Sequence, residues 1–125
     1  MKDVVELNKA LVEKLDDDIL VTAYKSNTEI SEEDAKEIDG AHVTMSQGDD
    51  MFVIVDLTSG AKLMKTAEDF LIKKAKMVPY TLAMAMVKES KGLFFRRVKG
   101  KRFLFPYKEF KTKEEAKAWI DTLRN

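Results

Sequence analysis

The sequence predicts an α/β fold with a mainly parallel, mixed sheet of four to five strands flanked by about four helices. Residues 51–57 and 80–87 are continuous apolar runs of strand length, which is typical of strands buried on both faces of a sheet. Helix start signals lie before and after these runs, and such alternation favours a layered α/β structure. No linker rich in Pro, Gly or Ser interrupts the chain, so we expect a single domain over residues 1–125.

Composition excludes several classes of site. The chain has 45% hydrophobic and 35% charged residues, as a globular protein does, and it has no cysteine. Disulfides, thiolate metal sites and cysteine nucleophiles are therefore excluded. A single histidine, His42, leaves little for a metal centre or a histidine-based triad, so we expect no enzyme, no metal and no cofactor. No apolar run reaches the roughly 20 residues of a membrane span, and the beginning lacks the apolar core of a signal peptide, so we expect a cytoplasmic protein.

The first 25 residues allow two interpretations. Apolar residues within 1–15 recur at helical spacing, which favours an amphipathic helix. Against this, two apolar triplets flank the acidic cluster 16–18, which is typical of a hairpin turn. Helix and strand stay open for residues 1–15, and we predict a hairpin over about residues 9–25.

Ser31 is the predicted N-cap of the first helix. Three acidic residues follow it and complement the positive end of the helix dipole. The face from Ala35 to Met45 is apolar, and His42 lies close to it, so we expect a packed or surface histidine. Residues 47–50 end this helix.

Thr66 is the predicted N-cap of a second helix, which Pro79 ends. The side chains expected on its buried face are Phe70, Leu71, Ala75 and Val78. Residues 80–87 then form the second buried strand.

The last third of the chain is less regular. Residues 93–95 begin either a short helix or a hairpin that turns at 99–101, and residues 102–105 predict a last, edge-like strand before Pro106.

A capping box at Thr112 predicts the C-terminal helix. Its apolar side consists of Ala116, Trp119, Ile120 and Leu123. We expect Trp119 to pack this helix onto the sheet.

Five segments carry a family resemblance: EISEEDAKEI at 29–38, FVIVDLTS at 52–59, KTAEDF at 65–70, LAMAMVKES at 82–90 and FPYKEFKTKEEAKAWI at 105–120. Together they resemble bacterial STAS-like domains, which are related to the anti-sigma-factor antagonists and to a lipid-binding, Sec14-like branch. The chain is most similar to a bacterial group of unknown function. This resemblance spans about residues 10–121 and implies a STAS-like domain that acts as a non-enzymatic regulatory or protein-interaction module.

The resemblance also implies candidate regulatory residues. In the anti-sigma-factor antagonists, a strand ending in Asp-Leu-Ser leads to a helix start with a phosphorylated serine, which switches binding to a partner kinase. Here Asp56 begins the matching strand end, and Thr66 falls at the phospho-acceptor position if one residue is inserted in the loop, although Lys65 replaces the family's acidic residue. The candidate partner-binding residues are Thr58, Ser59 and Thr66. The alternative interpretation of Thr66 is a helix cap alone.

Charge is sorted along the chain. Residues 1–60 carry 15 acidic and 5 basic residues, whereas residues 61–125 carry 7 acidic and 17 basic residues. Eight of the bases lie in residues 88–108 among interleaved aromatic residues. They form either a solvated rim that faces the acidic half or a surface for an anion.

The alternative function follows from this basic segment. It is binding of an anionic lipid or a phosphorylated small ligand through Arg96, Arg97, Lys99, Lys101 and Arg102. Nucleic acid is not an expected partner, because no RNA-binding aromatic signature is present. We expect a protein partner, and a homodimer is compatible with the sequence.

The methionines also allow two interpretations. They either fill the core or line an adaptable apolar pocket. The residues concerned are Met45, Met51, Met64, Met77, Met84 and Met86.

Overall fold

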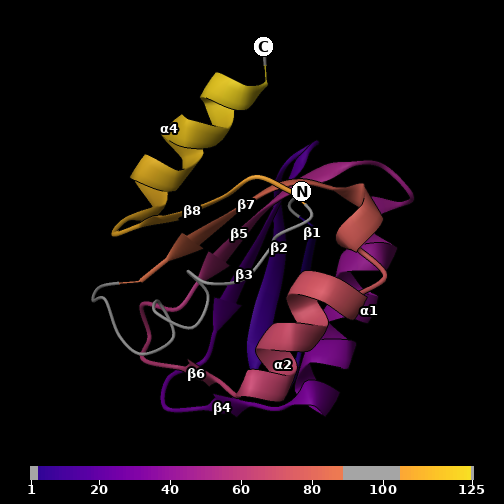
Figure 1. Cartoon of the computed structure of the whole chain (residues 1–125), viewed down its shortest axis with the longest axis vertical. Coiled ribbons are helices and arrows are strands. Elements are labelled where there is room, and N and C mark those ends of the chain that lie inside the picture. Colours follow the sequence, from indigo (N-terminus) through magenta and orange to yellow (C-terminus); the bar gives the residue numbers. More distant parts are fainter. Residues whose placement is uncertain (1–2, 89–104, 125) are drawn as a thin grey trace.

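A six-stranded mixed sheet forms the centre of the computed structural model, which describes residues 3–88 and 105–124 (Figure 1). In sheet order its strands are β1 (Asp3–Glu6), β2 (Ala10–Asp16), β3 (Ile19–Tyr24), β5 (Met51–Asp56), β7 (Thr81–Val87) and β8 (Tyr107–Phe110). A small second sheet pairs β4 (Glu29–Ile30) with β6 (Lys62–Leu63). The α/β class is confirmed, with more strands in the main sheet than predicted.

The sheet has an antiparallel part and a parallel part. β1, β2 and β3 are antiparallel neighbours, whereas β3, β5, β7 and β8 run parallel. The hairpin predicted over residues 9–25 is confirmed, because β2 pairs with β3 from Ala10 opposite Tyr24 to Asp16 opposite Ile19. Residues 1–15 were open to helix or strand, and the structure has the strands β1 and β2 there. β5 is central, and all six of its residues are buried, as its continuous apolar run predicts.

Helices cover both faces of the sheet (Figure 1). They are α1 (Glu32–Ser46), α2 (Lys65–Asp69), the π-helical turn η1 (Phe70–Lys74), the 3₁₀ turn η2 (Val78–Tyr80) and α4 (Lys113–Leu123). One apolar core joins α1 and α2 to the sheet, and a separate core joins α4 to the other face.

The predicted first helix is confirmed with its cap. Asp34 N donates to Ser31 Oγ at 3.2 Å, and Ser31 N donates to Asp34 Oδ2 at 2.9 Å, which completes a capping box. The helix ends where Gln47 and Gly48 adopt positive φ angles of 54° and 83°. Glycine reaches that conformation without steric cost, so the turn after α1 is encoded locally.

The prediction for the second helix is wrong at both ends. Its N-cap is Met64, so Thr66 is the second residue of α2 and caps nothing. The reason is tertiary: Met64 N donates to Ile30 O at 3.0 Å, which continues the β4–β6 pairing and keeps Met64 extended until the helix begins.

The far end of this helix is set by a buried carboxylate. η1 ends at Lys74, the N–H of the following Ala75 donates to Phe70 O, and Pro79 lies inside the later turn η2. Asp39 of α1 accepts hydrogen bonds from Lys76 N at 2.8 Å and Met77 N at 3.0 Å. These bonds hold the chain in a turn directly after η1, well before Pro79.

The C-terminal helix is confirmed. Thr112 Oγ1 accepts from Glu115 N at 3.1 Å, and the Trp119 and Phe110 ring centroids are 5.6 Å apart. Ala116 and Ile120 are fully buried against the sheet. Leu123, predicted on the same face, is instead 39% exposed.

The structure has a strand that the sequence did not predict. β8 begins directly after Pro106, where Pro106 O accepts from Met84 N at 2.9 Å and the pairing with β7 starts. Phe105 is buried outside any strand. Residues 102–104, with the elements predicted at 93–95 and 99–101, lie outside the described residues.

Candidate functional site

Thr58 and Ser59 lie in the loop after the central strand β5. Asp56 Oδ1 accepts hydrogen bonds from Thr58 N at 2.9 Å and Thr58 Oγ1 at 2.6 Å. Ser59 Oγ donates to Tyr24 O at 2.7 Å, which ties the loop to the end of β3. Both predicted hydroxyls therefore build the loop at the carboxyl ends of the parallel strands, where α/β folds usually carry their sites.

Thr66 lies further along the chain, beyond β6, and is exposed. Within the described part of the chain its hydroxyl has no hydrogen-bond partner. The structure thus brings two of the three candidates together in one loop and leaves Thr66 on the surface of α2. Thr66 is accessible there without having a part in the cap predicted for it.

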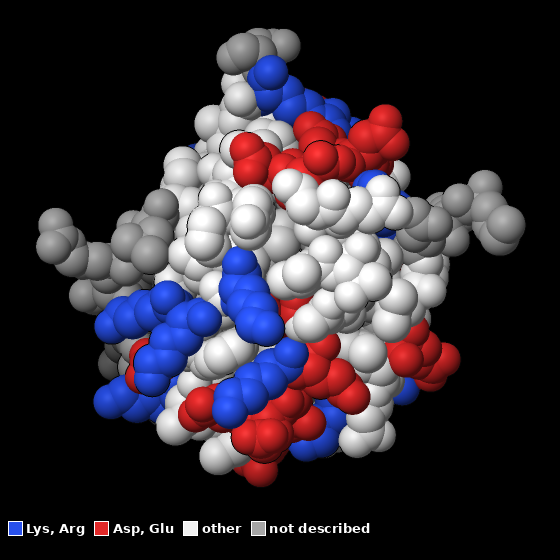
Figure 2. All heavy atoms as spheres, turned by 90° about the vertical axis from the view of Figure 1, so that its right-hand side faces the viewer, with Lys and Arg blue, Asp and Glu red and all other residues white. Residues whose placement is uncertain are grey.

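Exposed lysines recur along residues 62–76, the stretch of chain that contains Thr66. The lysine surface consists of Lys62, Lys65, Lys73, Lys74 and Lys76. In the described ranges 3–88 and 105–124, none of these five ammonium groups forms an ion pair. Figure 2 shows basic side chains gathered on the side of α2, beside acidic side chains near the beginning of α1. Met64, 47% exposed, adds an apolar side chain to this surface.

Five lysines elsewhere in the described ranges are ion-paired. Lys9 Nζ lies 2.8 Å from Asp34, Lys25 Nζ lies 3.0 Å from Glu6, and Lys36 contacts two glutamates of α1. On α4, Lys113 and Lys117 pair with aspartates at 3.8 and 3.5 Å. Among these five lysines only Lys113, paired with Asp56, joins the basic half of the sequence to the acidic half, so these pairs leave the charge sorting largely in place.

The predicted anion-binding residues Arg96, Arg97, Lys99, Lys101 and Arg102 lie outside the described residues. At the described end of this segment, burial lowers the pKa of the Lys88 ammonium, and the carboxylates of Glu109 and Glu68 oppose that shift. Tyr107 Oη donates to Glu109 Oε2 at 2.6 Å, and burial raises the pKa of Tyr107. Two carboxylates therefore lie near Lys88, where the basic segment begins.

The sequence did not single out two buried polar residues, Asp39 and Glu68, and for His42 it left a packed and a surface position open. Glu68, Asp39 and His42 are all almost fully buried. His42 Nε2 lies 2.6 Å from Thr22 Oγ1, and burial lowers the pKa of His42 to about 4, against the opposing effect of Asp39. The spacing of Asp39 and Glu68 in the sequence could have predicted their burial. Each lies three or four residues from an apolar side chain on the buried side of its helical segment.

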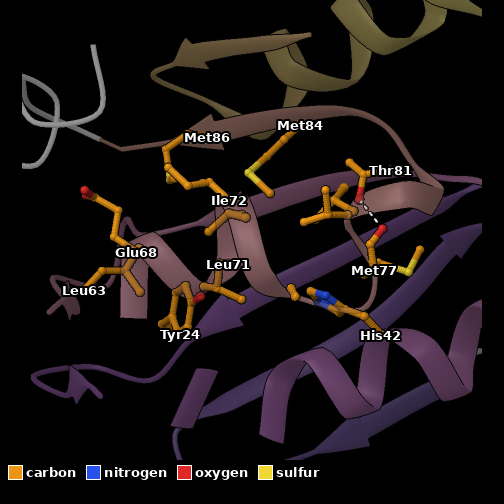
Figure 3. Close-up of a pocket in the computed structure, with 14 residues that line it drawn as sticks. Tyr24, His42, Leu63, Glu68, Leu71, Ile72, Met77, Thr81, Met84 and Met86 are labelled. Atoms are coloured by element: carbon orange, nitrogen blue, oxygen red, sulfur yellow. Dashed lines mark hydrogen bonds between the residues drawn. The ribbon is translucent and has the colours of Figure 1, made fainter. Parts of the chain in front are cut away.

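A small cavity lies between α1, η1 and the sheet (Figure 3). Its volume is about 30 Å³, and its lining is mainly apolar, with Met77, Met84 and Met86 among the side chains. Met45 and Met51 pack in a neighbouring cluster instead. Core filling therefore holds for five of the six methionines, three of which also line the cavity, whereas Met64 is exposed.

Neither a metal site nor a membrane-spanning helix is evident in the described ranges. No group of three or more His, Asp or Glu side chains there could hold a metal ion. Among the described helices, none combines the length and apolarity needed to cross a membrane.

Comparison with known proteins places this fold. The structure is similar to the crystal structure of an uncharacterized protein of the DUF3478 family with a SpoIIAA-like fold, from Shewanella loihica PV-4. The TM-score is 0.62 at 16% identity, covering 96% of this chain and 92% of that chain. At this identity the likeness shows the fold alone, and it confirms the STAS-like architecture.

Sequence comparison gives the family. A search of curated proteins finds no match. Residues 14–124 match the family model described as Domain of unknown function (DUF7793). Because this match extends over most of the sequence, the chain belongs to the DUF7793 family.

Proposed function

We propose that this protein is a non-enzymatic regulatory module that binds an acidic protein partner through the loop and helix start of residues 58–70 and the adjoining lysine surface. The SpoIIAA-like fold is compatible with such a role. The observation that carries the proposal is the set of five exposed lysines that form no ion pair within residues 3–88 and 105–124, whereas Lys9, Lys25, Lys36, Lys113 and Lys117 are ion-paired.

The chemistry of this surface favours a protein partner. Unpaired ammonium groups steer an acidic surface toward them. At the rim of an interface they stay partly hydrated, so the free-energy cost of removing water from them is small. Met64 supplies an exposed apolar side chain among them. An acidic partner with an apolar contact at its centre fits this arrangement.

The test compares two charge-reversed variants of equal net charge. Lys65→Glu with Lys73→Glu alters the lysine surface, whereas Lys14→Glu with Lys111→Glu alters two lysines far from it in the fold, on β2 and just before α4. We expect affinity capture from the native cell, with quantitative mass spectrometry, to lose at least tenfold of an acidic partner with the first variant only. Equal capture by both variants would contradict the proposal.

Thr66 tests the regulatory part separately. Thr66→Glu places a negative charge among the lysines and should weaken capture severalfold, whereas Thr66→Ala should maintain or increase it. Equal capture by the two variants would exclude a phosphorylation switch at Thr66 and would leave the binding surface itself to the lysine variants.

A further inference from the structure

The Tyr24 hydroxyl faces the cavity without a partner. Tyr24 ends β3, is 4% exposed and lines the cavity. Its backbone carbonyl accepts from Ser59 Oγ, but its phenolic oxygen forms no hydrogen bond with any residue in 3–88 or 105–124. A hydroxyl that borders a cavity and has no hydrogen-bond partner among the described residues is available to bind a guest. Because burial raises the pKa of Tyr24, the oxygen keeps its proton and can donate it.

The cavity wall is suited to apolar groups. Figure 3 shows Tyr24 and Leu71 on one side, with Met84 and Met86 on the other. The π-helical turn η1 supplies Leu71 and Ile72. At about 30 Å³ the space holds only a few atoms as it stands. Methionine side chains change rotamer readily, so this wall can move to admit a larger guest.

Two other polar groups of the wall already form hydrogen bonds. His42 Nε2 is bonded to Thr22, and Thr81 Oγ1 donates to Met77 O at 2.9 Å. Figure 3 shows the Glu68 side chain turned away from Tyr24. A buried water needs two to four polar partners, and this lining offers few. A mainly apolar guest with one acceptor oxygen matches the wall better.

We propose that this cavity binds a small, uncharged and mainly apolar molecule whose one carbonyl or ether oxygen accepts a hydrogen bond from Tyr24 Oη. The site is separate from the lysine surface, since it lies on the inner side of η1. It therefore does not depend on the protein-binding function proposed above.

The methionines provide the measurement. Cyclohexanone is titrated into protein labelled with ¹³C at the methionine methyl groups, and cyclohexane serves as the counterpart without an oxygen. We expect saturable shifts of the methyl signals of Met77, Met84 and Met86, with the exposed Met64 unaffected. Shifts of equal size at Met64, or no saturation with either probe, would overturn the proposal.

Tyr24→Phe removes only the hydroxyl, and Tyr80→Phe is its control, because Tyr80 is exposed and lies outside the cavity. Tyr24→Phe should weaken cyclohexanone binding about fivefold, because one hydrogen bond between neutral groups contributes about that much to affinity. It should leave cyclohexane binding unchanged. Tyr80→Phe should change neither. Equal cyclohexanone affinity in the Tyr24→Phe variant and the wild type would overturn the role of the hydroxyl.

The melting temperature of the free protein gives a second readout. Since the hydroxyl has no partner among the described residues, Tyr24→Phe should melt at the same temperature or higher. A lower melting temperature would show that the hydroxyl is already bonded within the folded protein, and would count against the proposal.

Discussion

The two faces of the sheet are packed in different ways. Under α4 an apolar core cluster lies beside the buried Asp56, which pairs with Lys113 of the helix, and the small side chains of Ala83 and Ala85 let the helix approach the strands closely. Under α1 and η1 the interior includes His42, Asp39 and the Tyr24 hydroxyl, together with a cavity bordered by methionines. The α4 face therefore serves stability, whereas the α1 face combines stability with buried groups that can respond to a guest or to protonation.

The largest expected effect tests this contrast directly. Ile120→Ala, in the α4 core, should lower the free energy of unfolding by about 2–5 kcal/mol, because a fully buried side chain is lost from a tightly packed site. Met84→Ala should cost less, since Met84 borders a cavity and lacks packing partners on one side. Chemical denaturation measures both, with Lys117→Ala as a surface control. Equal losses for Ile120→Ala and Met84→Ala would break the comparison.

The second prediction concerns protonation of the α1 face. The pKa of His42 is lowered from 6.5 to about 4 by burial, so the unfolded chain binds more protons between these values. The stabilisation from neutral His42 is complete above pH 6.5 and is lost as the pH falls toward 4, a change of about 3 kcal/mol.

His42→Gln removes this titration while other groups continue to respond. The lowered pKa of Asp34 also makes the fold less stable in acid, but it does so in both proteins. The difference in unfolding free energy between wild type and His42→Gln, measured from pH 7 to pH 4, isolates the histidine. Parallel pH profiles for the two proteins would show that His42 does not titrate between the folded and unfolded states.

The smallest expected effects concern the two helix starts on the α1 face. Ser31→Ala should cost about 1 kcal/mol, because Ser31 Oγ accepts from Asp34 N at the start of α1. Thr66→Ala should change stability by less than about 0.5 kcal/mol, because Thr66 caps nothing. Thermal denaturation of both variants compares them. A loss of about 1 kcal/mol for Thr66→Ala would restore the predicted cap.

Much of the fold could be predicted because its signals are local. The capping residues Ser31 and Thr112, the acidic turn after β2 and the continuous apolar run of β5 each encode an element within a few neighbouring residues. The structure confirms all four of these.

The candidate site was predicted less completely. Thr58 and Ser59 do share one loop, but their hydroxyls bind Asp56 and Tyr24 and so help to build it. Asp39 of α1 accepts hydrogen bonds from Lys76 N and Met77 N, which follow η1. These two donors lie 37 and 38 positions further along the sequence. No pattern of neighbouring residues predicts a hydrogen bond between groups so far apart in the sequence.

The sequence by itself determined the α/β class, the hairpin and both capped helices, because spacing and capping act over one or two turns of chain. Tertiary structure decided where α2 begins, since pairing of β4 with β6 keeps Met64 extended. It also decided which polar side chains are buried and which lysines of the described ranges form ion pairs. Those outcomes depend on which distant segments meet, and the long-range pairings of the sheet determine that.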